Sequence, residues 1–567
     1  MMATTPSPRK GAGAATLGLA VGATLAGGAA QAQVAPSTTP PVPGPSSSVL
    51  PATGTDVRVG NLRNQVSSLL ASGPAPLLGP NFIIQPSIGV DVGATDNALE
   101  VSSPRRADIF TLIYPSISLT GDTARLQVNA NYSPTVSLFA QTSSRTRVDQ
   151  YLSGDALATV VPDLFYVDLR SDITQSSITG GYGPYGTSSL NGTDQVQTSS
   201  VSLTPYLVHR FDGWGTGTLS YTLAYTNQTS VNGTVLPNGS TTTGFTGNQD
   251  LLTNRELAQF TSGENLGRTN LTGTVDLEQF SGSGAYTSSY RNLYTISGAY
   301  ALNRSIALIG EIGYENLHYS ATTLGTGAVN VNSPVYQAGV RWTPNADSNI
   351  AVTYGRQDGL DSVFVDGTYA PTARTRIYAS YSTGLTSSAE DEQNLLQSAS
   401  FTGGYATNAA TGAPLVSTSN AFGTQNVIYQ VQRLSVTGVL LRPRDTYSVG
   451  VVHEERRVVG GGSATSVANN NYGGTYGQFS WQHDLSPAVS TNVYLQYGTD
   501  TFAFVNGQGT IGNTDEQFAS ASASVSYAIS ASLTGHASYL FNDRFGSGVP
   551  GRDYLENIVL VGLRKGF

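Results

Sequence analysis

The chain has 567 residues, no cysteine and a formal net charge of −9. The lack of cysteine excludes a disulfide framework and thiolate metal sites, and the acidic balance argues against nucleic acid as a partner. Charged residues make up only 11% of the chain, and mean hydropathy is −0.11. A transmembrane β-barrel accounts for both values, because alternate residues face lipid and the others face a polar lumen.

The first element in chain order is a secretory signal peptide, which we expect to span residues 1–32. Arg9 and Lys10 supply its positive start, and an apolar stretch rich in Gly and Ala follows over residues 11–29. Ala30-Gln31-Ala32 matches a small-x-small cleavage site. A transmembrane anchor is the weaker alternative, since Gly and Ala contribute little insertion energy.

Residues 33–81 form the next segment, a periplasmic linker rich in Pro, Ser and Thr. Within it, residues 56–72 place apolar side chains at helical spacing, which allows one short helix. Two interpretations of this segment stay open: a periplasmic helix or small plug, and a partly disordered linker.

From Phe82 to Phe567 the hydropathy pattern has a period of two, which predicts β-strands. Turn-like connections such as Asn303-Arg304 alternate with long Gly, Ser, Thr and Asn-rich ones such as Gln228 to Gln249 and Thr386 to Thr424. Short periplasmic turns and long outer loops are typical of outer-membrane barrels. The sequence therefore predicts an all-β fold, a closed antiparallel transmembrane β-barrel over residues 82–567.

An even strand number of roughly 18 to 22 follows from the length at about 22 residues per strand with its connection. Both termini should lie in the periplasm, which requires this even number. The clear alternating segments leave the count one short. A further strand near Asp250 to Phe260 would restore the parity.

The end of the chain carries a predicted assembly signal. A terminal aromatic residue preceded by apolar residues at alternate positions is the pattern recognised by the bacterial barrel-assembly machinery, which we expect as a partner. Lys565 departs from the usual apolar residue at its position. The residues that fit the pattern are Val559, Val561, Leu563 and Phe567.

Alternation also assigns the two faces of the barrel. The outer face should include Val128, Val167, Leu308, Val493 and Leu495. The predicted lumen-lining residues carry charges of both signs together with a tyrosine: Arg125, Asp168, Arg170, Asp276, Glu278, Glu311, Glu315, Arg341, Arg374, Arg376 and Tyr494. Such residues suit a hydrophilic passage, but any one of them could simply satisfy its neighbours and water.

We expect no catalytic, cofactor-binding or metal-binding residues, and no enzyme activity. The five histidines show no metal-ligand spacing. His453-Glu454-Glu455 reads as a solvated group at the rim. His536 shares a strand face with Thr534 and Ser538, but nothing in the sequence orients its ring. The glycine-rich segment from Gly507 to Gly512 falls in a predicted outer loop rather than before a helix.

Several short segments resemble one family. They include Ile84 to Ile88 (IQPSI), Thr111 to Ile117 (TLIYPSI), Trp342 to Asn345 (WTPN), Ser348 to Arg356 (SNIAVTYGR), Ala379 to Ser382 (ASYS) and Glu556 to Phe567 (ENIVLVGLRKGF). The chain resembles the outer-membrane proteins associated with the PEP-CTERM/exosortase system, within the beta-barrel porin 2 class. This resemblance implies a role in exopolysaccharide production or export and supplies no catalytic residues.

The expected protein is thus a barrel of the Gram-negative outer membrane, a porin-like accessory or conduit for exopolysaccharide. Its expected partners are outer-membrane lipid, the assembly machinery, polysaccharide and periplasmic export proteins. Two alternatives remain: a general diffusion porin for small hydrophilic solutes, and a structural barrel without transport.

Overall fold

The computed structural model describes residues 82–177, 195–230, 249–321, 327–401, 407–409, 412–413, 415, 418–424, 427–459, 471–505, 511–548 and 552–567. The predicted signal peptide, the linker and the helix over residues 56–72 lie outside the described residues.

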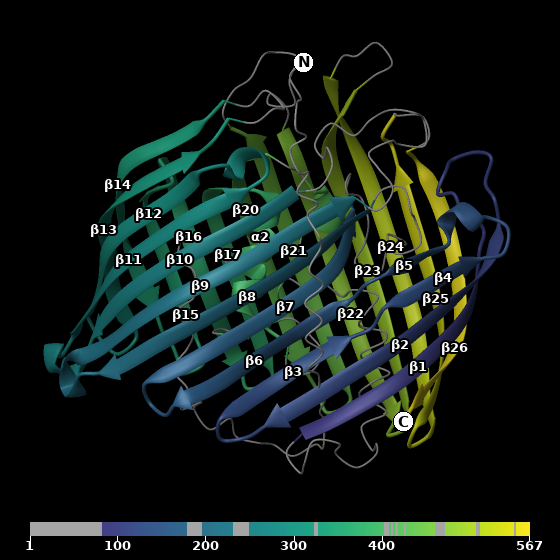
Figure 1. Ribbon diagram of the computed structural model, residues 1–567, viewed down its shortest axis with the longest axis horizontal. Coiled ribbons are helices and arrows are strands. Elements are labelled where there is room, and N and C mark those ends of the chain that lie inside the picture. The colour runs from purple at the N-terminus through teal and green to yellow at the C-terminus, as the bar shows by residue number, and fades with distance from the viewer. Residues whose placement is uncertain are drawn as a thin grey trace, which may run out of the picture.

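The strands are long and follow one another around a single sheet (Figure 1). The first half comprises β1 (Phe82–Thr95), β2 (Asp108–Asp122), β3 (Leu126–Tyr132), β4 (Thr135–Phe139), β5 (Arg147–Asp149), β6 (Leu152–Val161), β7 (Phe165–Ser177), β8 (Gln195–Arg210), β9 (Gly215–Ser230), β10 (Gln249–Ser262), β11 (Thr269–Gly282), β12 (Ser289–Ala301) and β13 (Ile306–Tyr319). The second half comprises β14 (Val329–Trp342), β15 (Asn349–Gln357), β16 (Leu360–Thr372), β17 (Thr375–Thr386), β20 (Tyr429–Leu441), β21 (Asp445–Val458), β22 (Asn471–Ser486), β23 (Val489–Val505), β24 (Ile511–Ser530), β25 (Leu533–Phe545) and β26 (Tyr554–Gly566).

The sheet closes on itself. β1 pairs antiparallel with β26, from Ser87 opposite Gly566 to Thr95 opposite Ile558. β3 and β4 both pair with β2, so together they occupy one strand position. On their other side β3 pairs with β6 and β4 pairs with β5, so β5 and β6 together occupy the next position. The barrel therefore has 22 strands. The predictions of a closed antiparallel barrel and of an even strand number within 18 to 22 are confirmed.

The strand that the alternation missed is β10. It pairs with β9 on one side and β11 on the other. Its outer face carries Asn254 and Glu256 between apolar residues, and Arg255 lies on its inner face. With polar side chains on both faces, the strand lacks the clear apolar row that marks its neighbours.

Both ends of the strand sequence, Phe82 and Phe567, lie at one end of the barrel, since β1 and β26 are paired in antiparallel register there. Two-residue turns join β16 to β17 and β24 to β25 at this same end. By the rule for outer-membrane barrels, this is the periplasmic end. The opposite end carries at least one short turn besides its long loops, since only Asp358 and Gly359 join β15 to β16. Both residues have positive φ, as a type I′ hairpin requires.

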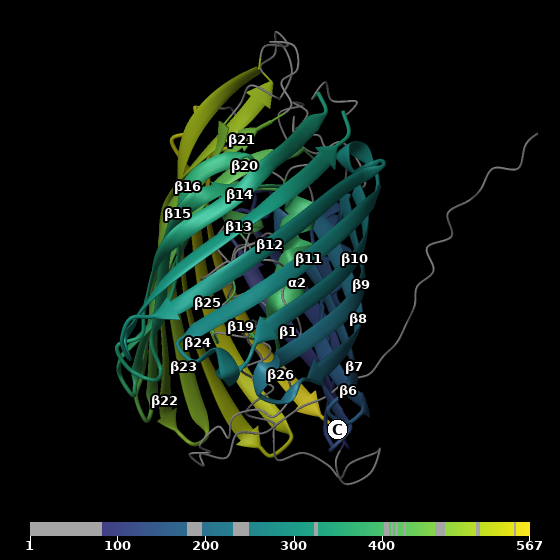
Figure 2. The same cartoon turned by 90° about the vertical axis from the view of Figure 1, so that its left-hand side faces the viewer.

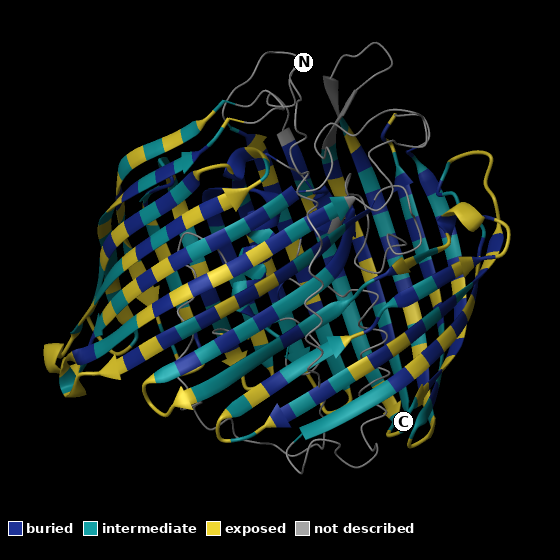
Figure 3. Cartoon of the chain, viewed as in Figure 1, coloured by how far each residue is buried: buried dark blue, intermediate teal, exposed yellow. Residues whose placement is uncertain are grey.

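The outer surface carries many exposed apolar side chains. Buried and exposed residues alternate along the strands (Figure 3). Ile312 is 66% exposed and Leu495 is 47% exposed. Near the periplasmic end, the rings of Trp342 and Tyr369 stack at 6.0 Å. An apolar band flanked by aromatic residues is the lipid-facing surface of an outer-membrane β-barrel, and this chain is one.

Among the predicted outer residues, Leu308 and Leu495 are exposed and Val167 and Val493 are half-buried. Val128, in contrast, is only 5% exposed. It shares a strand face with the exposed Tyr132. The side chains of Val128 and Phe82 both lie close over Gly121 on the neighbouring strand. Val128 is thus covered by its neighbours, and the expectation that it contacts lipid is wrong. Among the helices described, none is long and apolar enough to cross a membrane.

The inner surface is not uniformly polar. Phe110, Phe139, Ile558 and Leu560 form a buried apolar cluster together with Tyr114 at the seam where β1 meets β26. The ring of Tyr114 lies flat across Gly89, where a Cβ atom would stand 2.0 Å from its Cε2 atom. Only glycine fits beneath this ring.

Candidate lumen site

A segment between β17 and β20 lies inside the ring of strands, as Figures 1 and 2 show from two sides. It contains α2 (Ser388–Ser398), the short paired strands β18 (Ala399–Ser400) and β19 (Thr407–Asn408), and α3 (Ser419–Phe422). We call the described residues between 387 and 428 the insert. Sequence analysis assigned Thr386 to Thr424 to a long outer loop. That assignment is wrong in position, because α2 contacts the inner faces of β7 to β10, and α3 contacts β7, β22 and β23.

Local sequence explains why α2 forms. Ser387 is its N-cap, and the Ser387 side chain accepts a hydrogen bond from the backbone N–H of Glu390. Serine followed by glutamate at the third position is the capping-box pattern. Glu390 and Asp391 place negative charge in the first turn, which the helix dipole favours. The helix ends at Ala399, whose backbone is extended.

α2 is held to the wall by polar contacts and by the apolar packing of Ala389, which is fully buried against Leu251 and Phe280. Arg170 donates to the backbone carbonyls of Gln397 and Ala399, both at 2.6 Å. Thr253 donates to Gln393 at 2.6 Å. Each contact gives a hydrogen-bond partner to a polar group that would otherwise be buried without one. Leaving such a group without a partner costs more free energy than a hydrogen bond contributes on balance.

At its first turn, α2 meets two arginines from different strands. The guanidinium of Arg291 on β12 lies 3.4 Å from the Glu390 carboxylate, and the Tyr319 hydroxyl donates to Glu390 at 2.9 Å. Burial raises the pKa of Glu390 to about 7, although Arg291 opposes this shift. Arg433 on β20 donates to Asp391 at 2.8 Å.

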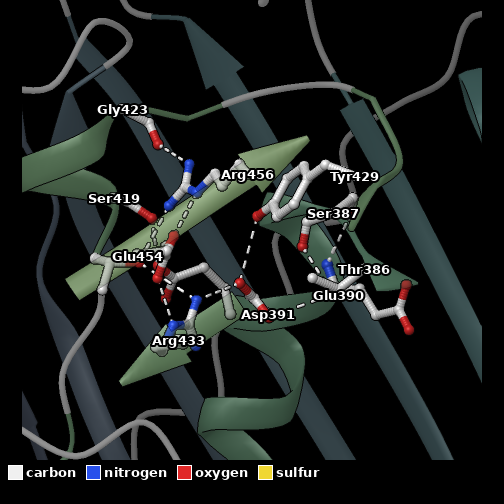
Figure 4. A network of polar contacts seen from close by, with 12 residues as sticks. Thr386, Ser387, Glu390, Asp391, Ser419, Gly423, Tyr429, Arg433, Glu454 and Arg456 are labelled. Atoms are coloured by element: carbon white, nitrogen blue, oxygen red, sulfur yellow. Dashed lines mark hydrogen bonds and ion pairs between the residues drawn. The ribbon is translucent and has the colours of Figure 1, made fainter. Parts of the chain in front are cut away.

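The Asp391 carboxylate stands at the edge of a larger ionic cluster, shown in Figure 4. Arg433 and Arg456 both pair with Glu454 on β21. Arg456 also donates to the backbone carbonyl of Gly423 at 2.7 Å. Thr418 donates to Glu454 at 3.3 Å. The hydrogen-bonding groups of these buried charges are thus satisfied partly by residues of the strands and partly by residues of the insert.

Glu454 corrects the expectation that His453-Glu454-Glu455 is a solvated group. The side chain of Glu454 is fully buried, while those of His453 and Glu455 are 43% and 68% exposed and lie 3.6 Å apart on the other face. The strand alternation separates them as predicted, and the insert buries the inner one.

The predicted lumen residues fall into three groups. Glu311 is half-buried on the inner face of β13, while Arg341 and Arg376 are exposed on inner faces near the periplasmic end. Arg125 and Arg374 are exposed in turns before β3 and β17. Those that are buried on the inner face are Asp168, Arg170, Asp276, Glu278, Glu315 and Tyr494.

The structure brings several of the buried ones together. Arg170 pairs with Asp168 at 2.8 Å. Arg255 pairs with Asp276 at 2.7 Å and with Glu278 at 3.2 Å. Sequence analysis did not single out Arg255, because it lies on the strand that was missed.

His536 has an orienting partner that the sequence did not show. Its Nε2 atom lies 3.1 Å from the carboxylate of Asp91, which also accepts a hydrogen bond from Tyr114 at 2.7 Å. These residues meet only because β1 closes against β26.

Arg544 and Arg552 pair with Glu516 on the inner face of β24, at 3.6 and 2.5 Å, but much of the inner face of β22 to β25 is uncharged. It carries a strip of uncharged polar residues, which we call the neutral strip: Gln478, Asn492, Tyr494, Gln496, Ser520, Ser522, Ser538 and Asn542. Tyr494 donates toward Gln478 and Gln496, at 3.2 and 3.1 Å. Amide and hydroxyl groups of this kind can exchange hydrogen bonds with a hydroxyl-rich solute.

The residues of the predicted assembly signal share the outer face at the end of the chain. Val559, Val561, Leu563 and Phe567 are each more than half exposed. Gly507 to Gly512 lies largely outside the described residues.

No protein-family model and no curated protein matches this chain. Among solved structures it is similar to the FrpB iron transporter from Neisseria meningitidis (F3-3 variant), with 10% identity, a TM-score of 0.47, and coverage of 86% of this chain and 82% of that one. It is also similar to the siderophore receptor PirA from Acinetobacter baumannii (9%, 0.45, 85% and 80%). A third is the ferric-catecholate import receptor Fiu from E. coli K12 in its open form (12%, 0.46, 84% and 81%).

Proposed function

We propose that this outer-membrane barrel is a constricted conduit for saccharide chains that serves exopolysaccharide production or export. The observation that carries the proposal is the neutral strip on β22 to β25, which lies on the inner face of the barrel that also holds the insert. Amide and hydroxyl groups suit sugars through hydrogen bonding. The family resemblance points to the same substrate class.

A passing polymer needs many weak contacts, because a single tight site would hold it. The neutral strip offers side chains with modest net hydrogen-bond energies of about 0.5–1.5 kcal/mol each. Mixed charges elsewhere on the wall differ from the single-sign ring that selects an ion. The barrel contributes the path and performs no covalent chemistry in this proposal.

Deleting the gene tests the proposal. We expect less extracellular polysaccharide while intracellular synthesis continues, and restoration by the full chain. A deletion strain that exports normal polymer but loses uptake of small hydrophilic solutes would establish the general-porin alternative. A strain with neither defect would leave a structural barrel.

A further inference from the structure

We infer that the inner wall carries a carboxylate-binding site, which Asp391 of the insert occupies and which a carboxylate-bearing saccharide can take in its place. The inference rests on the proposed function, because it assumes that saccharide enters the lumen. The inference narrows the proposed substrate to saccharides that carry carboxylates. It also proposes that such a saccharide moves α2 by replacing Asp391 at Arg433.

The site is built from residues outside α2. The Asp391 carboxylate is close to Arg433 at 2.8 Å, to the Thr386 hydroxyl at 3.2 Å and to the Tyr429 hydroxyl at 3.4 Å (Figure 4). Arg433 and Tyr429 belong to β20, and Thr386 is the last residue of β17. Three donors from two adjacent strands thus converge on one carboxylate.

Charge explains why this position needs an anion. Arg433 and Arg456 share the single wall carboxylate of Glu454, so the wall trio carries one excess positive charge, and all three side chains are at least nine-tenths buried. A buried charge without compensation is strongly destabilising. Asp391 supplies that compensation from the insert, and a planar carboxylate from a solute matches a guanidinium equally well.

The hold on α2 is of a kind that a solute can replace. Its sequence, Ser388 to Ser398, contains only Ala389, Leu395 and Leu396 as apolar residues, and its contacts with Arg170, Thr253 and Arg291 are polar. Polar contacts of this type give small net energies, since water or a polar solute can take them over. Exchange at Asp391 therefore frees the first turn of α2 from Arg433, while Ala389 in the same turn still packs in the buried apolar cluster with Leu251 and Phe280.

The test uses the full chain reconstituted in planar bilayers, with oligogalacturonate as the acidic probe and a neutral malto-oligosaccharide of equal length. We expect the acidic probe to block the current at lower concentration. Asp391→Asn weakens the internal competitor and should lower the half-blocking concentration of oligogalacturonate about tenfold, a usual size for coupling between two sites. Arg433→Gln should raise it and leave the neutral probe unaffected.

A matched pair on the outer face provides the control. Arg356 and Asp361 lie 2.9 Å apart near the turn between β15 and β16, with side chains 34% and 43% exposed. Arg356→Gln and Asp361→Asn remove the same charges and should change neither half-blocking concentration. Equal block by both probes, or no effect of Asp391→Asn, would overturn the inference while saccharide passage stands. If neither probe alters the current, the proposed function falls as well.

Discussion

Two parts of the inner wall solve the problem of polar burial in different ways. The wall around α2, from β7 to β12 and from β17 to β21, buries ion pairs such as Arg255 with Asp276 and Arg433 with Glu454. The neutral strip on β22 to β25 buries amides and hydroxyls. A buried charge that loses its partner costs several kcal/mol, whereas a neutral polar group that changes its partner costs less free energy. The first wall is suited to fixing a structure in place, and the second to letting a solute pass.

The largest expected effect breaks the ionic wall. Glu454→Gln removes the carboxylate that Arg433 and Arg456 share and should destabilise the barrel by about 3–5 kcal/mol, the usual cost of leaving buried charges unpaired. Heat-modifiability on gels and urea unfolding measure this. Glu455→Gln is the control on the same strand, since its side chain is exposed and should change stability by less than about 0.5 kcal/mol. Equal effects would show that the insert does not bury this cluster.

The same measurement on the neutral strip should give a smaller change. Tyr494→Phe removes one hydroxyl that donates to the amides of Gln478 and Gln496, so we expect a loss of about 1 kcal/mol. Tyr497→Phe, whose hydroxyl donates to Gln517 on the outer face, is the matched control. If Tyr494→Phe costs as much as Glu454→Gln, the contrast between the two walls is false.

The docking of α2 should depend on pH through Glu390. Its pKa is about 7 in the docked helix and 4.5 in water, so between these values the docked state binds a proton that an undocked helix releases. Acid therefore favours docking, and docking weakens as pH rises through 7. The chain has no cysteine, so thiol labelling of Asn394→Cys can follow α2 directly. Labelling rates are divided by the rate of an unfolded control at the same pH, because thiolate formation alone speeds the reaction in base. The corrected rate should be higher at pH 8 than at pH 5.5, and Glu390→Gln should flatten the difference. Faster labelling in acid would contradict the assignment.

The smallest effect concerns charges outside both walls. Arg374 and Arg376 are exposed near the periplasmic end. Replacing both with glutamine should change single-channel conductance by less than about twofold and stability by less than about 0.5 kcal/mol, because exposed charges are solvated and screened. Loss of folded barrel in this double variant would place these residues in the framework.

Alternation predicted the barrel well, because each strand from β11 to β17 carries its own apolar row on one face. It failed where that row is broken, as by Asn254 and Glu256 on β10. The insert was missed for a different reason. Its Gly, Ser and Thr-rich composition is typical of a surface loop, although Ser387 and Glu390 form a capping box that signals a helix. The contact of Asp391 with Arg433 joins positions 42 residues apart, and periodicity carries no information on such pairs.

The covalent attachment of the insert has a quantitative consequence. α2 begins directly after the cap that follows Thr386, the last residue of β17, so Asp391 is tethered close to its own binding site. A short tether gives a group an effective concentration of about millimolar or above. A single free carboxylate must exceed that concentration to compete. A chain with many carboxylates reaches it locally, because each departing group is followed by the next. The tether would thus make the lumen respond to polymers and ignore monomers of the same chemistry.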